Sequence, residues 1–504
     1  MKFQRFVCLL LVLVFCLGLF ACNDTVPPDG HVGDRVDGSW EGVNFDGQTV
    51  KVCVSTNQFK EVTFPAADIY TKGPDTAGSN EVTKEVLARN RAASDTLGIK
   101  IVYSERNLGW DEVHEDVRAI VQTAAKNSPD VYTNDSYGLS RAMVDGLLWN
   151  VKNPGDGVKS YFDFEAEGWY YEFMRGLTFN QDKFYLFAGD YFIDMIRMAW
   201  VIYVNHDILL ANLGKMPSWC TSIDTFYEFI ADGFFTVDML AELSARVFVE
   251  GSGGVLGTTE KTDSTVGFAY CGNSNWMFSA SSNITLYYQD KEDGYKPKVM
   301  ETIDDYQKVS NKFANLTATQ GVYYEHDTIE PTNCFLQGNF LFAISRLGEM
   351  ESKAFRDFSA AKGLVPLPKW DDNVQEEYHT VIHDQVEIGC ILNTAQAFSA
   401  ASALMQYLNE ESDKVVYTYY EKGLKYKYND DKNAREMMDI VRETTDSPFG
   451  FQIGVLCQSL YTGSPALTGL YIKNNTTVAS TFASEKDAYN ACMAEMIAKF
   501  EKLP

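Results

Sequence analysis

The chain has 504 residues, of which 45% are hydrophobic and 13% aromatic, and its formal net charge at neutral pH is −26. This length corresponds to about three average domains, and the composition is that of a globular protein able to bury large cores. So acidic a surface repels phosphate backbones and anionic lipid headgroups. The charge therefore excludes nucleic-acid binding and argues against membrane attachment through a basic patch.

The first 21 residues have the pattern of an export signal. Lys2 and Arg5 precede an apolar run from Val7 to Phe20. That run is shorter than the roughly 20 residues that a membrane-spanning helix needs. Ala21 supplies the small residue that signal cleavage requires, and Cys22 follows it directly.

The cysteine after the signal admits two interpretations. In the first, the chain carries an ordinary secretory signal in which Cys22 is incidental. Alternatively, the residues LFAC (19–22) resemble a lipobox, which makes Cys22 the lipidated first residue of the mature protein. A diacylglyceryl thioether plus an N-acyl chain such as palmitate would supply stable anchoring. The mature chain would then carry 41 basic and 69 acidic residues, a charge of −28, and reside outside the cytoplasm.

Seven cysteines follow Cys22, and none of them forms a CxxC pair. They are Cys53, Cys220, Cys271, Cys334, Cys390, Cys457 and Cys492. The odd number and the spacing indicate neither a zinc knuckle nor a redox motif. Most stand among apolar residues, as buried thiols do, and their oxidation states stay open.

Strands and helices alternate after a polar leader. Residues 22–47 are rich in Pro, Gly and Asp without any period, which predicts a flexible tether. The predicted strands that follow are 49–55, 99–104 and 129–135, and the helices between them are 80–97, closed by Gly98, and 112–126. This β-α-β-α-β order predicts a parallel sheet covered by helices, and hence an α/β fold.

The alternation continues to the C-terminus without an internal repeat. Further strands are predicted at 183–189, 198–205, 267–271, 340–345 and 364–368, with an extended segment at 380–392. Further helices are predicted at 140–146, 222–230, 236–249, 394–409, 433–443 and 484–501.

Several stretches in this order resemble one known family. MAWVIYVNHDIL resembles a strand followed by the signature YNKDLL, with Asn205 and Asp207 in their places. DGFFTVDMLAEL, FLQGNFLFAI and GLVPLPKWD resemble three later elements, and YYEKGLKYKYNDDKNAREMMDIV resembles the C-terminal section of a branch common among Gram-positive lipoproteins. From about residue 48 to 504 the chain thus resembles the extracellular solute-binding proteins, family 1, of ABC importers, the maltose-binding-protein-like group.

This resemblance implies a two-lobed periplasmic-binding-protein type II fold, in which hinge-linked α/β lobes enclose a central cleft. Lobe 1 would comprise residues 48–190 plus 393–430, and lobe 2 residues 191–388 plus 445–504. Hinge closure around a ligand is the working motion of such proteins, and the membrane permease senses it.

The resemblance also implies a function. The chain would be a lipid-anchored extracytoplasmic protein, not an enzyme, without a cofactor, that captures a mono- or oligosaccharide for ABC permease subunits. Two other functions remain open at this point: an anchored, secreted glycoside-active enzyme, and a chemosensory binding protein.

Candidate ligand residues stand at strand ends, where α/β sheets bind ligands. Asp135 ends a predicted strand and matches a position where sugar binders of this family use an acid; its simpler role is an N-cap. Trp110 and Trp276 lie among Gly, Asn and Asp residues and could stack on a sugar face, whereas Trp169 and Trp200 are predicted to be packed structure.

Further candidates lie near the predicted crossings between the lobes, at Asp190 and Asp384, and after the predicted strand 340–345, at Arg346. Asp190, with Asp194 nearby, could bind ligand or lock a hinge. Arg346 could pair with an acidic ligand group or with a neighbouring acid, and Asp384 in the stretch IHDQ has a similar standing.

Catalytic and metal motifs are not found. His379, His383 and Glu387 have the i, i+4, i+8 spacing of a zinc-binding helix face, but the β-branched residues between them predict a strand. HExxH, GxSxG and GxxxxGK sequences are lacking, and nothing singles out a pair of carboxylates for glycoside hydrolysis.

Overall fold

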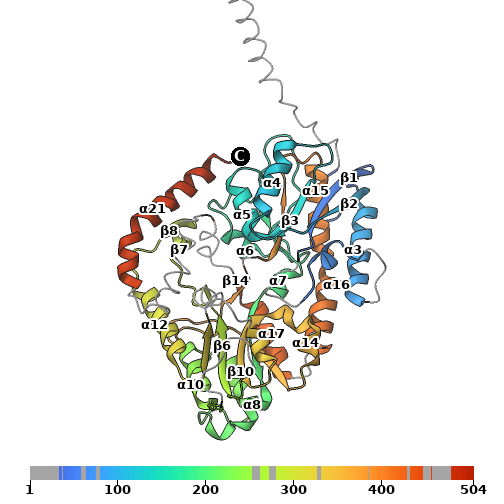
Figure 1. The fold of residues 1–504 in the computed structure, drawn as a ribbon. Helices are drawn as coiled ribbons and strands as arrows, with labels where there is room; N and C mark the ends of the chain where they lie inside the picture. Colours follow the sequence, from blue (N-terminus) through green and yellow to red (C-terminus); the bar gives the residue numbers. More distant parts are fainter. Residues whose placement is uncertain are drawn as a thin grey trace, which may run out of the picture.

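Two five-stranded sheets, each with its own helices and hydrophobic core, form the body of the protein (Figure 1). The computed structural model describes residues 33–36, 38–57, 64–74, 80–252, 262–271, 280–325, 331–383, 385–427, 432–446, 456 and 478–504. The mixed α/β class predicted from the sequence is confirmed.

The first sheet has the strand order β2-β1-β3-β13-β4. Its strands are β1 (Gln48–Ser55), β2 (Ile99–Arg106), β3 (Val131–Asp135), β4 (Leu186–Phe187) and β13 (Glu387–Ile391). Strands β2 and β3 both run parallel to β1, and helices α3 (Glu81–Leu97) and α4 (Val113–Thr123) connect them. The predicted β-α-β-α-β unit is therefore confirmed. Strand β13 enters antiparallel to β3 from a distant part of the chain.

Local signals explain the limits of α3. The side chain of Asn80 accepts a hydrogen bond from the backbone N–H of Val82, which satisfies one of the free donors at the helix start. Gly98 ends the helix with φ of 60°, a left-handed conformation that favours glycine. A Cβ at this position would also lie 2.4 Å from Oδ1 of Asn44. The predicted C-cap is confirmed.

The second sheet has the order β11-β5-β10-β6-β9. Its strands are β5 (Trp200–Asn205), β6 (Val266–Cys271), β9 (Val322–Glu325), β10 (Phe340–Arg346) and β11 (Lys362–Val365). Strands β6, β9 and β10 are parallel, whereas β5 runs antiparallel to both β10 and β11. Helices that follow or precede these strands are α8 (His206–Ala211), α9 (Ile223–Ala231), α10 (Val237–Val247) and α12 (Asp304–Ala318).

Shorter elements complete the two lobes. Helices are α2 (Asp68–Thr71), α5 (Ser136–Val144), α6 (Tyr171–Gly176), α7 (Asp194–Arg197), η1 (Leu213–Lys215), η3 (Lys291–Asp293), α13 (Pro331–Phe335), η4 (Leu347–Glu351) and α14 (Lys353–Asp357). Two small sheets pair β7 (Tyr287–Asp290) with β8 (Lys296–Val299), and β12 (Thr380–Val381) with β14 (Thr445–Asp446).

Three segments cross between the sheets. The first crossing, residues 188–199, joins β4 to β5, and the second, residues 382–386, joins β12 to β13. They run side by side, because Ala199 and Ile382 form an antiparallel bridge. The third passes from α15 (Phe398–Glu410) through α16 (Asp413–Val416) and η5 (Tyr417–Lys427) to α17 (Lys432–Glu443). Element η5 is a π-helix, a form that is rare at this length.

One predicted lobe boundary differs from the observed sheet. Residues 387 and 388, which the sequence analysis placed in lobe 2, belong to β13 of the first sheet. Helix α21 (Val478–Lys502) contacts both lobes: the ring of Phe500 near its end lies 5.4 Å from Phe179 and 5.3 Å from Tyr185, and the backbone N–H of Ala479 near its start donates to the side chain of Gln307 in α12 at 3.3 Å. Apolar helix positions do not specify which core they join. The other lobe boundaries stay predictions.

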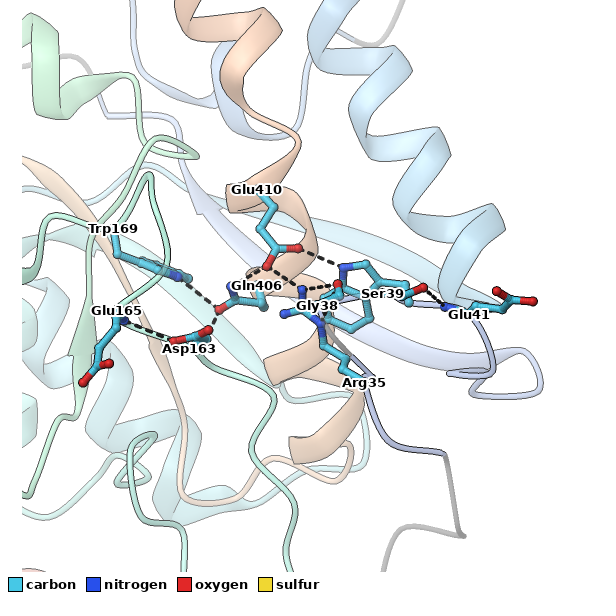
Figure 2. Close-up of polar contacts among 10 residues, drawn as sticks. Arg35, Gly38, Ser39, Glu41, Asp163, Glu165, Trp169, Gln406 and Glu410 are labelled. Atoms are coloured by element: carbon cyan, nitrogen blue, oxygen red, sulfur yellow. Dashed lines mark hydrogen bonds and ion pairs between the residues drawn. The ribbon is translucent and has the colours of Figure 1, made fainter.

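Residues 33–36 and 38–47, which we call the N-terminal strap, dock on the first lobe. Arg35 forms an ion pair with Glu410 of α15 at 2.8 Å (Figure 2). The indole N–H of Trp40 donates to the same carboxylate at 2.9 Å. The Arg35 guanidinium also lies 4.2 Å from the Trp40 ring centroid. These residues were expected to belong to the flexible tether, and their docking on the first lobe differs from that expectation.

The aromatic side chains of the strap explain why it docks. Trp40 stacks on Tyr161 with ring centroids 6.0 Å apart and meets Tyr407 edge-on at 5.7 Å. Val43 and Phe45 are buried in the core of the first sheet. A Pro- and Gly-rich composition indicated a tether, but a few large apolar side chains suffice to hold the segment.

We expect Trp40→Ala to lower the free energy of unfolding by about 2 kcal/mol, because a half-buried indole loses its apolar contacts and its hydrogen bond to Glu410. Urea denaturation followed by circular dichroism measures the change. The exposed neighbour Glu41, changed to Ala, serves as a control and should shift the stability by less than about 0.5 kcal/mol. Equal midpoints for the two variants would contradict a stabilising strap.

Candidate functional site

The carboxyl edges of the two sheets adjoin the crossings. In the first sheet β1 and β3 end at Ser55 and Asp135, and β13 starts at Glu387, which pairs with Asp135. In the second sheet β10 ends at Arg346, which pairs with Trp200 at the start of β5. Because ligands bind at the carboxyl ends of strands in open α/β sheets, these two edges are the candidate site.

Trp110 is an exposed aromatic at the first edge. It lies in the turn between β2 and α4, and 43% of its surface is exposed. Its ring meets the buried ring of Tyr137 edge-on, with centroids 5.0 Å apart. Gly138 allows this turn to approach α5, since a Cβ there would lie 2.5 Å from Cβ of Val113. A supported and exposed indole is suited to stacking, but ligand contact by Trp110 stays a prediction.

Asp135 is the N-cap of α5. Its Oδ1 accepts a hydrogen bond from the backbone N–H of Gly138 at 2.7 Å, and the residue is only 2% exposed. The simpler of its two predicted roles is therefore confirmed. A second role toward a ligand stays a prediction.

Asp190 lies on the first crossing, between β4 and α7. Burial raises the pKa of its carboxyl to about 6, although the guanidinium of Arg442 on α17 acts in the opposite direction. The hydroxyl of Tyr170 is hydrogen-bonded to Asp190. This carboxyl therefore lies between the first and third crossings. Both predicted roles of Asp190, ligand binding and locking of the hinge, stay predictions.

Arg346 lies at the second edge among rings. Its guanidinium carbon is 4.4 Å from the ring centroid of Trp200, and the ring of His383 stacks on the same indole at 5.6 Å. Trp200 is 2% exposed, as expected of packed structure. Trp169 is also buried and donates to Oε1 of Gln406 at 3.0 Å (Figure 2). A ligand role for Arg346 stays a prediction.

Three predicted residues lie outside the described residues: Cys22, Trp276 and Asp384. The described part of the chain contains no group of three or more His, Cys, Asp or Glu side chains that could hold a metal ion. Nor does any helix in that part have the length and apolar character needed to cross a membrane.

A buried ionic cluster joins the crossings, and of its members the sequence analysis named only Asp194. We call Tyr70, Asp194, Arg197, Glu351 and Tyr419 the crossing node. Arg197, 1% exposed, pairs with Oδ1 of Asp194 at 2.7 Å and with Oε1 of Glu351 at 2.8 Å. Glu351 also accepts hydrogen bonds from the hydroxyls of Tyr70, at 2.8 Å, and Tyr419, at 2.5 Å.

The five members of the crossing node come from four parts of the fold, because Asp194 and Arg197 share helix α7. Tyr70 belongs to α2 after β1, Arg197 to the first crossing, Glu351 to η4 after β10, and Tyr419 to η5 on the third crossing. Burial opposes the charge on Arg197, but the two carboxylates raise the pKa of Arg197 well above its usual range. The one available sequence signal was a lone Arg in the apolar run MIRMAWVIYV.

Comparison of the sequence with protein-family models and with curated proteins gave no match. Solved structures do share the fold. The GacH receptor of Streptomyces glaucescens, solved unliganded and with acarbose, is 12% identical with a TM-score of 0.53, over 89% of this chain and 99% of that chain. The galacto-N-biose-/lacto-N-biose I-binding protein of a Bifidobacterium longum ABC transporter is 12% identical with a TM-score of 0.54, over 90% and 98%.

A third solved structure is an ABC transporter solute-binding protein from Thermotoga lettingae bound with α-D-tagatose. It is 12% identical with a TM-score of 0.52, over 89% of this chain and 100% of that chain. The chain thus has the fold of ABC-transporter solute-binding proteins over nearly all of its length, and the predicted fold class is confirmed.

We expect Arg197→Ala to destabilise the protein by roughly 3–5 kcal/mol, because two buried carboxylates lose their cation. Chemical denaturation measures the loss. Arg246→Ala is the matched control, since Arg246 pairs with Glu242 on the surface, where such pairs contribute at most about 1 kcal/mol. A loss for Arg197→Ala no larger than that of the control would contradict the role of the crossing node.

Proposed function

We propose that this chain is an extracytoplasmic solute-binding protein that captures a carbohydrate between its lobes and delivers it to an ABC-transporter permease. The observation that carries the proposal is the fold itself: two sheets whose carboxyl edges adjoin three crossings, as in solved structures of sugar-binding proteins. Such a protein needs only different affinities for the ligand in its open and closed states, and no chemical conversion.

The side chains at the first edge support a sugar as the ligand class. Trp110 offers an exposed aromatic face, held in place by the buried ring of Tyr137. Asp135 places a carboxyl group at the same edge. An aromatic face combined with polar groups that fix orientation is the usual composition of a small-molecule site.

A disulfide supports a location outside the cytoplasm. Cys492 on α21 is disulfide-bonded, whereas Cys53, Cys220, Cys271, Cys334 and Cys390 are buried thiols that form no disulfide. The partner of Cys492 therefore lies outside the described residues. Because disulfides persist mainly in oxidising compartments, the bond agrees with the export signal in residues 1–21.

The proposal includes a lipid anchor on Cys22. The N-terminal strap is docked from residue 33 onward, so the chain between anchor and body would comprise residues 22–32. Attachment by acyl chains suits a protein whose acidic surface disfavours binding to anionic lipid.

Cys22→Ser is expected to release the protein from the membrane fraction of expressing cells, because the variant lacks the thiol that the lipid modifies. Fractionation followed by mass spectrometry of the N-terminal peptide measures both effects. Cys53→Ser is the control and should stay membrane-bound, since Cys53 is buried in β1. Recovery of an unmodified residue 22 from the membrane-bound wild type would contradict lipid anchoring.

The sugar ligand is tested by thermal shift against mono- and oligosaccharides. A bound sugar should raise the melting temperature and be recovered unchanged, because it stabilises the folded state alone. Trp110→Ala should weaken the binding of that sugar about tenfold, since the indole supplies a stacking face. Calorimetric titration gives the two affinities.

Leu210→Ala is the matched control for Trp110→Ala. Leu210 is an equally exposed apolar residue on α8, at the end of the second sheet opposite Trp200 and Arg346. The Leu210→Ala variant should leave the affinity for the sugar unchanged. Consumption of an oligosaccharide, or a panel in which no sugar raises the melting temperature, would count against the proposed function.

A further inference from the structure

Glu387 is a buried carboxyl directly after the second crossing. It is 3% exposed, and its Oε1 accepts a hydrogen bond from the hydroxyl of Thr133 at 2.5 Å. The backbone amide of Ser55 at the end of β1 also bonds this carboxyl. Its second oxygen, Oε2, is buried without a hydrogen-bond partner. An ionised carboxylate in this position would leave a charged oxygen unsatisfied, which is costly.

Among the described residues, the charged groups that act most strongly on Glu387 are the acids Asp194 in α7 and Asp68 in α2. Cys53 in β1 and Tyr191 on the first crossing also interact with it electrostatically, and Asp135 in β3 is its partner in the sheet. The guanidinium of Arg197 is engaged by Asp194 and Glu351. Burial first, and the charge of Asp194 second, raise the pKa of Glu387 to about 8.

The cover over Glu387 depends on how the lobes are arranged. Thr133 and Ser55 belong to the first sheet, but Asp194 belongs to the first crossing, where it accepts a hydrogen bond from the backbone N–H of Glu387. Through Arg197, Asp194 is linked to Glu351 of the second lobe. A hinge rotation that displaces the second lobe would therefore act on Asp194 and, through it, on the groups that bury the carboxyl.

We propose that the hinge is proton-linked: the described arrangement of the lobes holds a proton on the Glu387 carboxyl, and an arrangement in which water reaches this carboxyl releases the proton. This device is independent of which ligand the protein binds. It makes the balance between the two arrangements depend on external pH.

The direction of the effect follows from linkage. Below the ordinary glutamate pKa of about 4.3 the carboxyl is protonated in both arrangements, and pH has no influence. Between that value and about 8, rising pH favours the hydrated arrangement, by up to tenfold in the equilibrium constant per pH unit. Above about 8 the carboxyl is ionised in both arrangements, and the dependence ends.

The experiment measures the distance between the lobes without any ligand. Spin labels are placed on cysteines introduced at the exposed positions Lys100 of β2 and Asn311 of α12, in a Cys22→Ser background. Pulsed electron resonance then records the distance distribution from pH 5 to pH 9. For the otherwise unchanged chain we expect a population shift with rising pH that levels off above about pH 8.

Glu387→Gln cannot ionise, and its distance distribution should not respond to pH. Glu377→Gln is the matched control, because Glu377 is an exposed acid on the connection before β12, and it should respond like the parent chain. A parent chain that does not respond to pH, or a Glu387→Gln variant that still responds, would overturn the proposal. Because no sugar is present, either result leaves the proposed carbohydrate binding untouched.

A second variant keeps the proposal testable if circular dichroism shows that Glu387→Gln does not fold. Thr133→Val removes the hydroxyl that donates to the carboxyl and favours its ionised form. The pH at which the population shift levels off should therefore move upward. A levelling pH that stays where it was in the parent chain would contradict the assignment to Glu387.

Discussion

One buried guanidinium constrains how the two halves of this protein are joined. Arg197 contacts carboxylates from its own helix and from the second lobe, and it lies over the rings of Phe64 and Tyr70 at 4.5 and 4.9 Å. Burying the charge carries a large desolvation cost, which both carboxylates must offset. The arrangement tolerates little displacement of any partner, and so it fixes where the crossings meet.

The sequence predicts well those features that a few neighbouring residues determine. The alternation over 49–55, the helix closed by Gly98 and the first β-α-β-α-β unit all follow from local periodicity and capping. The strap was expected to be a flexible tether, because its position depends on which distant surface its apolar side chains meet. Composition alone indicated a tether around Trp40, yet its partners Tyr161 and Tyr407 lie more than a hundred residues away.

In the candidate site, too, local features could be predicted from the sequence and long-range contacts could not. Trp110 and Asp135 could be named in advance because strand ends are visible in the sequence, and the structure places both at the first edge. Glu387 was noticed only for its spacing from His383. That spacing suggested a metal site on a helix, but the β-branched residues between them predicted a strand and so excluded it. The raised pKa of Glu387 depends on its burial and on its neighbours Thr133 and Asp194, which are distant in sequence. Thr133 donates a hydrogen bond to the carboxyl, and Asp194 adds a negative charge beside it.

Two buried acids near the crossings illustrate how environment separates their roles. Glu351 receives hydrogen bonds from Arg197, Tyr70 and Tyr419, so its carboxylate is satisfied by groups from three segments and holds them together. Glu387 has one oxygen without a hydrogen-bond partner, and the charges of Asp194 and Asp68 oppose its ionisation, so burial favours its protonated form. The same carboxyl chemistry therefore gives a fixed connection between segments at Glu351 and a protonation-dependent one at Glu387. A hinge requires both kinds of connection.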